Sequence, residues 1–137
     1  MGNTCFAGDA AGACITGSDF ISVTSAPPQF DLAHTLNSID LLKSRDFDIL
    51  YLTHFGSVLS PKQHLSDYRE AVELNAEFIR QRLEENMDPE SLKVAYQAFC
   101  MEQAFGVETA RETWDILQKV NGADMCAEGI RLFWENK

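Results

Sequence analysis

Two residues of types that bind metal ions each follow a short apolar run in this chain. Asp9 lies in the sequence Gly-Asp-Ala-Ala-Gly at positions 8–12, and His54 lies in Thr-His-Phe-Gly at positions 53–56. A carboxylate and an imidazole at the ends of strands are common metal ligands in α/β proteins. Asp9 and His54 are therefore the candidate metal ligands, and the sequence assigns no catalytic residue.

Each of these two residues also has a simpler explanation. Asp and Gly favour turns, so Asp9 could cap a turn or a short helix after a strand. His54 could close the loop after its own strand through hydrogen bonds to the backbone. Taken together, at the same edge of a sheet, the two residues indicate a site more strongly than either does alone.

The segment between the two runs determines whether they meet. Leu32, Leu36, Ile39 and Leu42 recur at three- and four-residue spacing, which predicts a helix over 31–44 with Asp31 as its N-cap. Strand, helix and strand in this order form a βαβ unit, whose strands are parallel. Parallel strands end at one edge of the sheet, so we expect Asp9 and His54 to approach each other there.

The remaining pattern predicts a mixed α and β chain. A second short strand is expected at 20–23, before Ala26-Pro27-Pro28 stops regular structure. From Ser60 onward, caps, prolines and apolar stripes predict only helices. We expect an α+β (α/β) fold with a small mixed sheet over residues 1–87, followed by a helical extension over 88–137.

Composition excludes several partners. The net charge of -10 and pI of about 4.6 disfavour nucleic acid and anionic membrane surfaces. No apolar run reaches the roughly 20 residues that cross a bilayer, and no signal peptide is expected. The four cysteines form no Cys-x-x-Cys pair, so we expect reduced thiols and a cytoplasmic location.

The other two histidines lie on expected helices. His34 lies on the expected helix and is predicted to be exposed. His64, at the start of the next helix, is predicted to lie on the surface, with a supporting role behind the site as the alternative. The chain lacks the second glycine of a Gly-x-Ser-x-Gly elbow and the Lys-Ser/Thr of a phosphate loop.

The segments 6–12 and 51–56, in this order, resemble the C-terminal half of metallo-β-lactamase-fold hydrolases, in the glyoxalase II-like branch. Residues 121–134 also look like the helical tail of such proteins. The resemblance implies that Asp9 bridges two metal ions and that His54 ligates one of them. In the family these ions are zinc, or iron or manganese, and the alternative for this chain is that it binds none. The implied activity is hydrolysis of an ester, thioester or lactam-type bond by metal-bound water.

The chain departs from this family in one large respect. The family signature His-x-His-x-Asp-His belongs to the N-terminal half of its αββα sandwich, and no two histidines of this chain can form it. A hydrolytic zinc site needs about three protein ligands and an open position for water. We therefore expect a chain that is inactive alone and that needs a complementary N-terminal half. The alternative is a non-catalytic oligomerisation or partner-binding module, with a homo-oligomer as its expected state.

Overall fold

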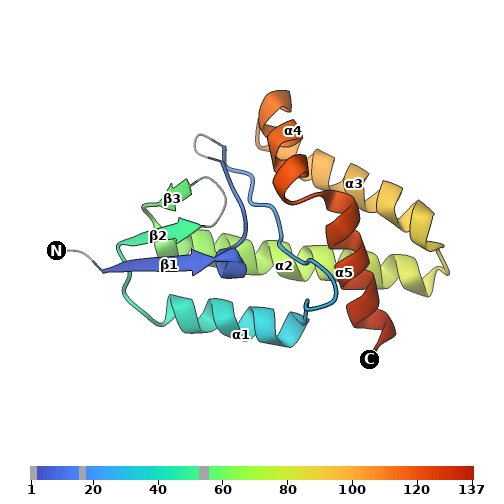
Figure 1. The fold of residues 1–137 in the computed structure, drawn as a ribbon, viewed down its shortest axis with the longest axis horizontal. Helices are drawn as coiled ribbons and strands as arrows, with labels where there is room; N and C mark the ends of the chain where they lie inside the picture. The colour runs from blue at the N-terminus through green and yellow to red at the C-terminus, as the bar shows by residue number, and fades with distance from the viewer. Residues whose placement is uncertain (1–2, 16–17, 53–55) are drawn as a thin grey trace.

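A three-stranded mixed sheet lies at one end of the computed structural model, which describes residues 3–15, 18–52 and 56–137 (Figure 1). Strands β1 (Thr4–Gly8) and β2 (Ile49–Leu52) pair in parallel, as the βαβ pattern predicted. Strand β3 (Gly56–Val58) pairs antiparallel with β2 and was not predicted. Three residues are too few to show an alternating pattern, so no periodic signal marks β3 in the sequence.

Helix α1 (Leu32–Lys43) connects the two parallel strands, and its predicted N-cap is confirmed. The Asp31 carboxylate accepts a hydrogen bond from the His34 backbone N–H at 2.9 Å. The buried Ile39 of α1 packs with Leu50 and Leu52 of β2 in one apolar cluster. Side chains of α2 (Pro61–Glu84) complete this cluster, so α1 and α2 cover a single face of the sheet.

The strand predicted at 20–23 is wrong. Residues 18–30 run as a loop, and the segment makes only one isolated antiparallel bridge, between Ala13 and Ser22. The two backbone bonds of that bridge measure 3.0 and 2.7 Å. The loop faces helices instead of a sheet, because Asn121 Nδ2 donates to the Val23 carbonyl at 2.9 Å.

The remaining helices are α3 (Pro89–Gly106), α4 (Arg111–Val120) and α5 (Ala123–Glu135). Proline occupies the first position of both α2 and α3, where a missing N–H costs no hydrogen bond. Asp88 caps α3 by accepting from the Ser91 N–H at 3.0 Å. Gly106 is the last residue of α3 and Gly122 is the N-cap of α5, so glycines separate the last three helices.

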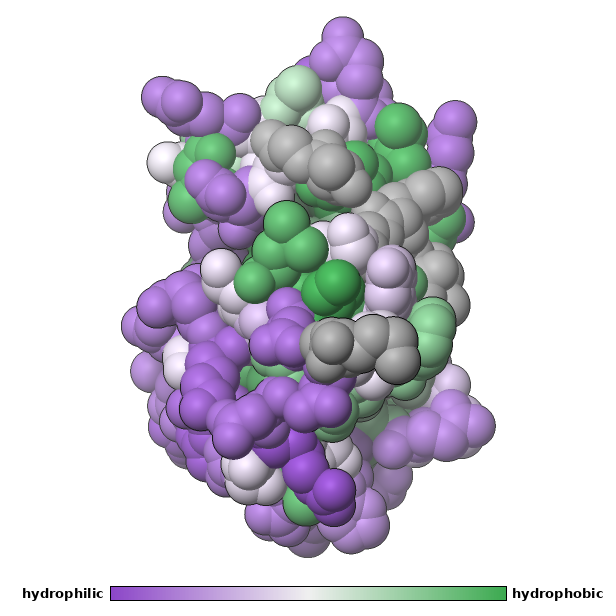
Figure 2. Space-filling model, turned by 90° about the vertical axis from the view of Figure 1, so that its left-hand side faces the viewer, coloured by the Kyte–Doolittle hydropathy of each residue, from purple (hydrophilic) through white to green (hydrophobic). Residues whose placement is uncertain are grey.

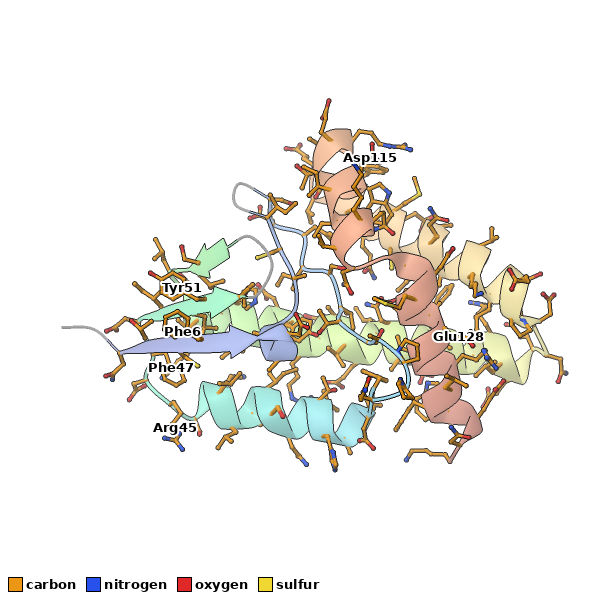
Figure 3. All side chains as sticks on the ribbon, viewed as in Figure 1. Phe6, Arg45, Phe47, Tyr51, Asp115 and Glu128 are labelled. Carbon is orange, nitrogen blue, oxygen red and sulfur yellow. The ribbon has the colours of Figure 1, made fainter. Side chains whose placement is uncertain are left out.

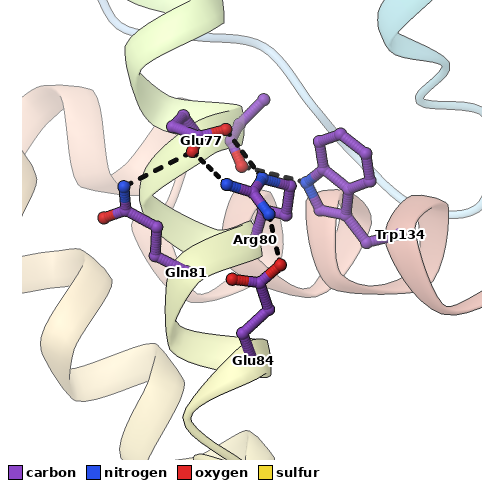
Figure 4. Close-up of polar contacts among 6 residues, drawn as sticks. Glu77, Arg80, Gln81, Glu84 and Trp134 are labelled. Atoms are coloured by element: carbon purple, nitrogen blue, oxygen red, sulfur yellow. Dashed lines mark hydrogen bonds and ion pairs between the residues drawn. The ribbon is translucent and has the colours of Figure 1, made fainter.

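Helix α5 docks on α2 through both apolar and polar contacts (Figure 4). The Trp134 indole Nε1–H donates to the Ala76 carbonyl at 2.9 Å. Beside it, the Arg80 guanidinium bonds to Glu77 and Glu84 along α2. These exposed ion pairs contribute little to stability, so the apolar contacts and the indole bond carry the docking.

One apolar cluster joins the loop before α1 to the C-terminal helices. Ala13, Phe20 and Phe30 pack in it with buried residues of α2, α3, α4 and α5. The Ser25 hydroxyl donates to the Cys126 carbonyl of α5 at 2.9 Å. The core therefore extends across residue 87, and the division of the chain into 1–87 and 88–137 stays a prediction.

Candidate functional site at the end of strand β1

Asp9 begins a short 3-10 turn, η1 (Asp9–Ala11), directly after β1. Gly8 precedes the turn with φ 59° and ψ -136°, and Gly12 follows it with φ 86° and ψ -174°. Residues with a Cβ rarely adopt such positive φ angles, so both glycines of the Gly-Asp-Ala-Ala-Gly sequence are needed for the shape of the backbone. This shape turns the chain sharply and leaves the Asp9 side chain exposed at the sheet edge.

Helix α2 supports this turn through His64. The imidazole Nε2 lies 2.8 Å from the Ala11 carbonyl oxygen, and the side chain is 9% exposed. The prediction of a surface position for His64 is therefore wrong. The signal that identifies it is its spacing: His64 precedes Leu65 by one residue and Tyr68 by four, so it lies on the buried stripe of α2.

The protonation of His64 follows from its surroundings. A carbonyl oxygen only accepts hydrogen bonds, so Nε2 carries the proton that it shares with Ala11. Burial lowers the pKa of His64, with the Ala11 carbonyl acting in the opposite direction. His64 is thus a neutral donor to the turn at pH 7.

Tyr68, one helical turn beyond His64, supports the other end of the turn through Thr24. The Thr24 hydroxyl donates to the Asp9 carbonyl at 2.7 Å, and it lies 3.1 Å from the Tyr68 hydroxyl. The Tyr68 hydroxyl also accepts the Thr24 N–H at 3.2 Å. Tyr68 is fully buried, and desolvation raises its pKa, so the phenol stays protonated.

A pocket of about 330 Å³ opens beside Asp9. Asp31 and His34 also line it, His34 being exposed as predicted, together with several hydroxyl-bearing side chains. The lining residues of the described chain include neither Lys nor Arg. Asp9 and Asp31 both contribute carboxylates to this pocket, and negative charge favours a cation or a neutral polar group over an anion.

The second candidate ligand, His54, lies outside the described residues. Its strand nevertheless fixes where the chain leaves the sheet: Leu52, the last residue of β2, pairs with Gly8, the last residue of β1. Because the two strands are parallel, both continue from the same edge. Asp9 follows directly after β1 at this edge.

Asp9 fits one ligand position of a metal centre, because it is an exposed carboxylate beside a polar pocket. Within residues 3–15, 18–52 and 56–137, however, no three His, Cys, Asp or Glu side chains are grouped as an ion would require. A complete hydrolytic centre needs more donors than Asp9 and one histidine. The described residues therefore fit a contribution to a metal centre and not a whole one.

No protein-family model, curated protein or solved structure matches the chain. The resemblance to metallo-β-lactamase-fold hydrolases therefore stays a prediction from the sequence motifs. Among the described helices, none is both long enough and apolar enough to cross a membrane.

The face of the sheet opposite α1 and α2 carries exposed aromatic side chains. Phe6 of β1 and Tyr51 of β2 are register partners, and their rings stack with centroids 5.1 Å apart (Figure 3). Phe6 is 80% exposed, and Leu59 just after β3 is 75% exposed. Figure 2 looks onto the end of the molecule where β1 and β2 begin. Hydrophobic side chains are exposed among hydrophilic ones near the middle of this face.

Proposed function

We propose that this chain is the C-terminal half of a metal-dependent hydrolase domain of the metallo-β-lactamase type. In this proposal Asp9 and His54 are its contribution to a metal centre. The observation that carries the proposal is the parallel pairing of Gly8 with Leu52, because the strands that precede the two candidate ligands then end at one edge of the sheet. The substrate class would be an ester, a thioester or a lactam-type compound.

The surroundings of Asp9 support this role. Its carboxylate is exposed beside the 330 Å³ pocket, which a second carboxylate, that of Asp31, also lines. Two backbone carbonyls of the turn accept hydrogen bonds from His64 and Thr24. A bound metal would supply an activated water for hydrolysis, and the chain's own part is to hold the carboxylate in place.

The open face of the sheet supports the idea of a half domain. The exposed, stacked Phe6–Tyr51 pair gives this face of the sheet an apolar surface that a second layer could cover. Stacked sheets pack about 10 Å apart with interdigitated side chains, and such a layer could bring the ligands that this chain lacks. The isolated chain is accordingly proposed to be inactive.

Manganese broadening of NMR signals tests the site in the protein as it exists, because paramagnetic Mn²⁺ reveals even weak binding. The wild type should lose the amide signals around Asp9 first as Mn²⁺ is added, and Asp9→Asn and His54→Ala should each weaken that effect. The double variant should add little to either single variant, since both side chains would hold one ion. His34→Ala is the matched control, because His34 lines the same pocket without a proposed ligand role.

Hydrolysis tests the completed domain. The chain is mixed with a half that carries His-x-His-x-Asp-His, and zinc-dependent cleavage of a thioester is followed. Activity that appears in the mixture and disappears with Asp9→Asn is expected. If the chain shows no local broadening by Mn²⁺ and the mixture stays inactive, the hydrolase proposal is refuted.

A second function is favoured by the same exposed face: a non-catalytic module that binds a partner or a second copy through Phe6 and Tyr51. Phe6→Ser should then abolish association measured by analytical ultracentrifugation at micromolar concentrations. Val94→Ser is the matched control, because Val94 is 70% exposed on α3, far from the sheet in the fold. A wild-type chain that remains monomeric would argue against this module.

A further inference from the structure

We propose that His64 and Tyr68 are positioning residues for Asp9, which they hold from helix α2 through the two end carbonyls of the η1 turn. This inference rests on the proposed function, because it assigns Asp9 as the ligand that is positioned. The hydrogen bonds themselves are independent of any metal, so the two ideas can fail separately.

The first contact comes from His64. Its Nε2–H donates to the Ala11 carbonyl at 2.8 Å from a side chain that is 9% exposed. Ala11 is itself fully buried, so its carbonyl depends on a protein donor more than an exposed one would. Loss of the imidazole would leave this end of the turn without the donor that α2 provides.

The second contact comes from Tyr68, and the donor of each hydrogen bond in it can be assigned. The Thr24 hydroxyl proton is given to the Asp9 carbonyl at 2.7 Å, so at the 3.1 Å contact the Tyr68 O–H must be the donor. The Tyr68 oxygen in turn accepts from the Thr24 N–H at 3.2 Å. The phenol therefore fixes both the backbone and the hydroxyl of Thr24, which fixes the Asp9 backbone.

The ring of Tyr68 adds a steric contact. A Cβ on Gly12 would lie 2.6 Å from the Tyr68 Cε1 atom, so the turn lies directly on the ring. His64 and Tyr68 are four residues apart and hence neighbours on one face of α2. Helix α2 thus fixes the position of the turn backbone at Asp9, the residue that carries the carboxylate.

Such supporting groups have a measurable effect where a ligand is involved. Removal of hydrogen-bonding groups behind a metal ligand typically weakens metal affinity by about 10- to 100-fold. Here the groups act on the ligand's backbone, at one remove from the carboxylate. We expect a loss near the lower end of this range, about 10-fold, for Mn²⁺ at Asp9.

Four variants separate positioning from general packing. His64→Leu removes the donor, and His64→Gln keeps an amide N–H near the end of the side chain. Tyr68→Phe removes only the hydroxyl. Tyr96→Phe is the matched control, because Tyr96 is an equally buried tyrosine, 1% exposed, in the helical cluster away from the turn.

Two measurements are made on each variant: Mn²⁺ affinity from NMR broadening near Asp9, and amide hydrogen exchange at Gly12 and Ala13. His64→Leu and Tyr68→Phe should bind Mn²⁺ about 10-fold more weakly and should exchange faster in the turn. His64→Gln should recover part of both effects, and Tyr96→Phe should change neither. Unfolding curves show in the same samples that each variant is folded.

The outcomes distinguish the two proposals. If the wild type binds Mn²⁺ at Asp9 and His64→Leu and Tyr68→Phe bind it equally well, positioning is refuted while the metal proposal stands. If the wild type and Asp9→Asn show the same weak broadening, the metal proposal fails. His64 and Tyr68 then have no metal ligand to position. Unchanged exchange in the turn would refute even the structural part of the inference.

Discussion

Gly129 provides the sharpest test of how the C-terminal helices join the rest of the chain. It lies in α5, where the helix backbone touches the loop before α1. A Cβ at this position would be 1.6 Å from the Ser25 carbonyl oxygen and 2.8 Å from its carbonyl carbon. Both atoms belong to backbone, so no side-chain rotation can relieve the contact.

The cost of Gly129→Ala can be worked out from this geometry. An ordinary C···O contact is about 3.3 Å, so loop and helix must separate by roughly 1.7 Å. Overpacking of a core costs about 1–3 kcal/mol. The shift also breaks the buried 2.9 Å bond from Ser25 to the Cys126 carbonyl, a loss of about 1 kcal/mol. We expect the free energy of unfolding to fall by about 2–4 kcal/mol, a large part of the ~5–15 kcal/mol of a typical domain.

Urea unfolding followed by circular dichroism measures this loss, with Gly106→Ala as the matched control. Gly106 ends α3, and no atom lies within 4 Å of where its Cβ would be. Alanine there should leave stability unchanged or raise it slightly, because alanine has the higher helix propensity. If Gly129→Ala unfolds within about 0.5 kcal/mol of the wild type, a value typical of neutral surface substitutions, α5 does not contact the loop as described.

Three further predictions concern buried polar groups. Burial lowers the pKa of His64, so below pH 6.5 the unfolded chain takes up a proton that the native chain resists, and stability should fall towards pH 5. Urea midpoints should show a slope of at most ~1.4 kcal/mol per pH unit, which His64→Gln should flatten; an unchanged slope would contradict this assignment. Burial raises the pKa of Cys100 to about 12, so Ellman's reagent at pH 8 should modify it only after unfolding, and rapid native labelling found by peptide mass spectrometry would contradict its burial. Asn121→Ala should cost about 1–3 kcal/mol in urea unfolding, because Asn121 Nδ2 donates to Ser22 and Val23, whereas the exposed Asn37→Ala should cost almost nothing.

The elements that local chemistry defines were predictable from the sequence. Asp31 caps the helix that it was expected to cap, and proline begins α2 and α3. Chain order alone predicted the parallel pairing of β1 with β2, because two such strands joined by one helix have few alternatives. These signals lie within a few residues of the feature that they predict.

The errors arose where distant residues decide the structure. Residues 20–23 have the composition of a strand, but Asn121 and Cys126 bind the backbone at Val23 and leave only one bridge. His64 is polar and near a helix start, which favours the surface, yet the carbonyl of Ala11 gives it a buried partner. The spacing of His64 on the α2 stripe marks its burial, but hydrogen-bond partners 53 to 103 residues away leave no local trace in the sequence.

The candidate site was predicted only in part, and the part that remains open is its chemistry. The edge of the sheet and the place of Asp9 follow from the βαβ order, whereas His54 lies outside the described residues. The support of the turn by α2 could not be inferred, because it depends on a helix register that places two side chains under one loop.

Helix α2 connects the site to the helical part of the chain. His64 and Tyr68 support the turn, Val72 packs towards the sheet, and the Ala76 carbonyl accepts the indole of Trp134. The first and last of these residues are twelve positions apart, or about 18 Å along one helix. Helix α5 therefore contacts the same helix that supports the η1 turn.

The turn itself separates what the backbone requires from what chemistry requires. Gly8 and Gly12 are explained by their positive φ angles, and Ala11 is explained by its complete burial. None of these reasons demands a carboxylate at position 9, because asparagine suits such a turn equally well. Asp9→Asn should therefore preserve the fold and the amide exchange of the turn while removing a negative charge. If that variant keeps its stability and loses Mn²⁺, the aspartate is present for an ion; if it loses stability instead, the aspartate serves the turn.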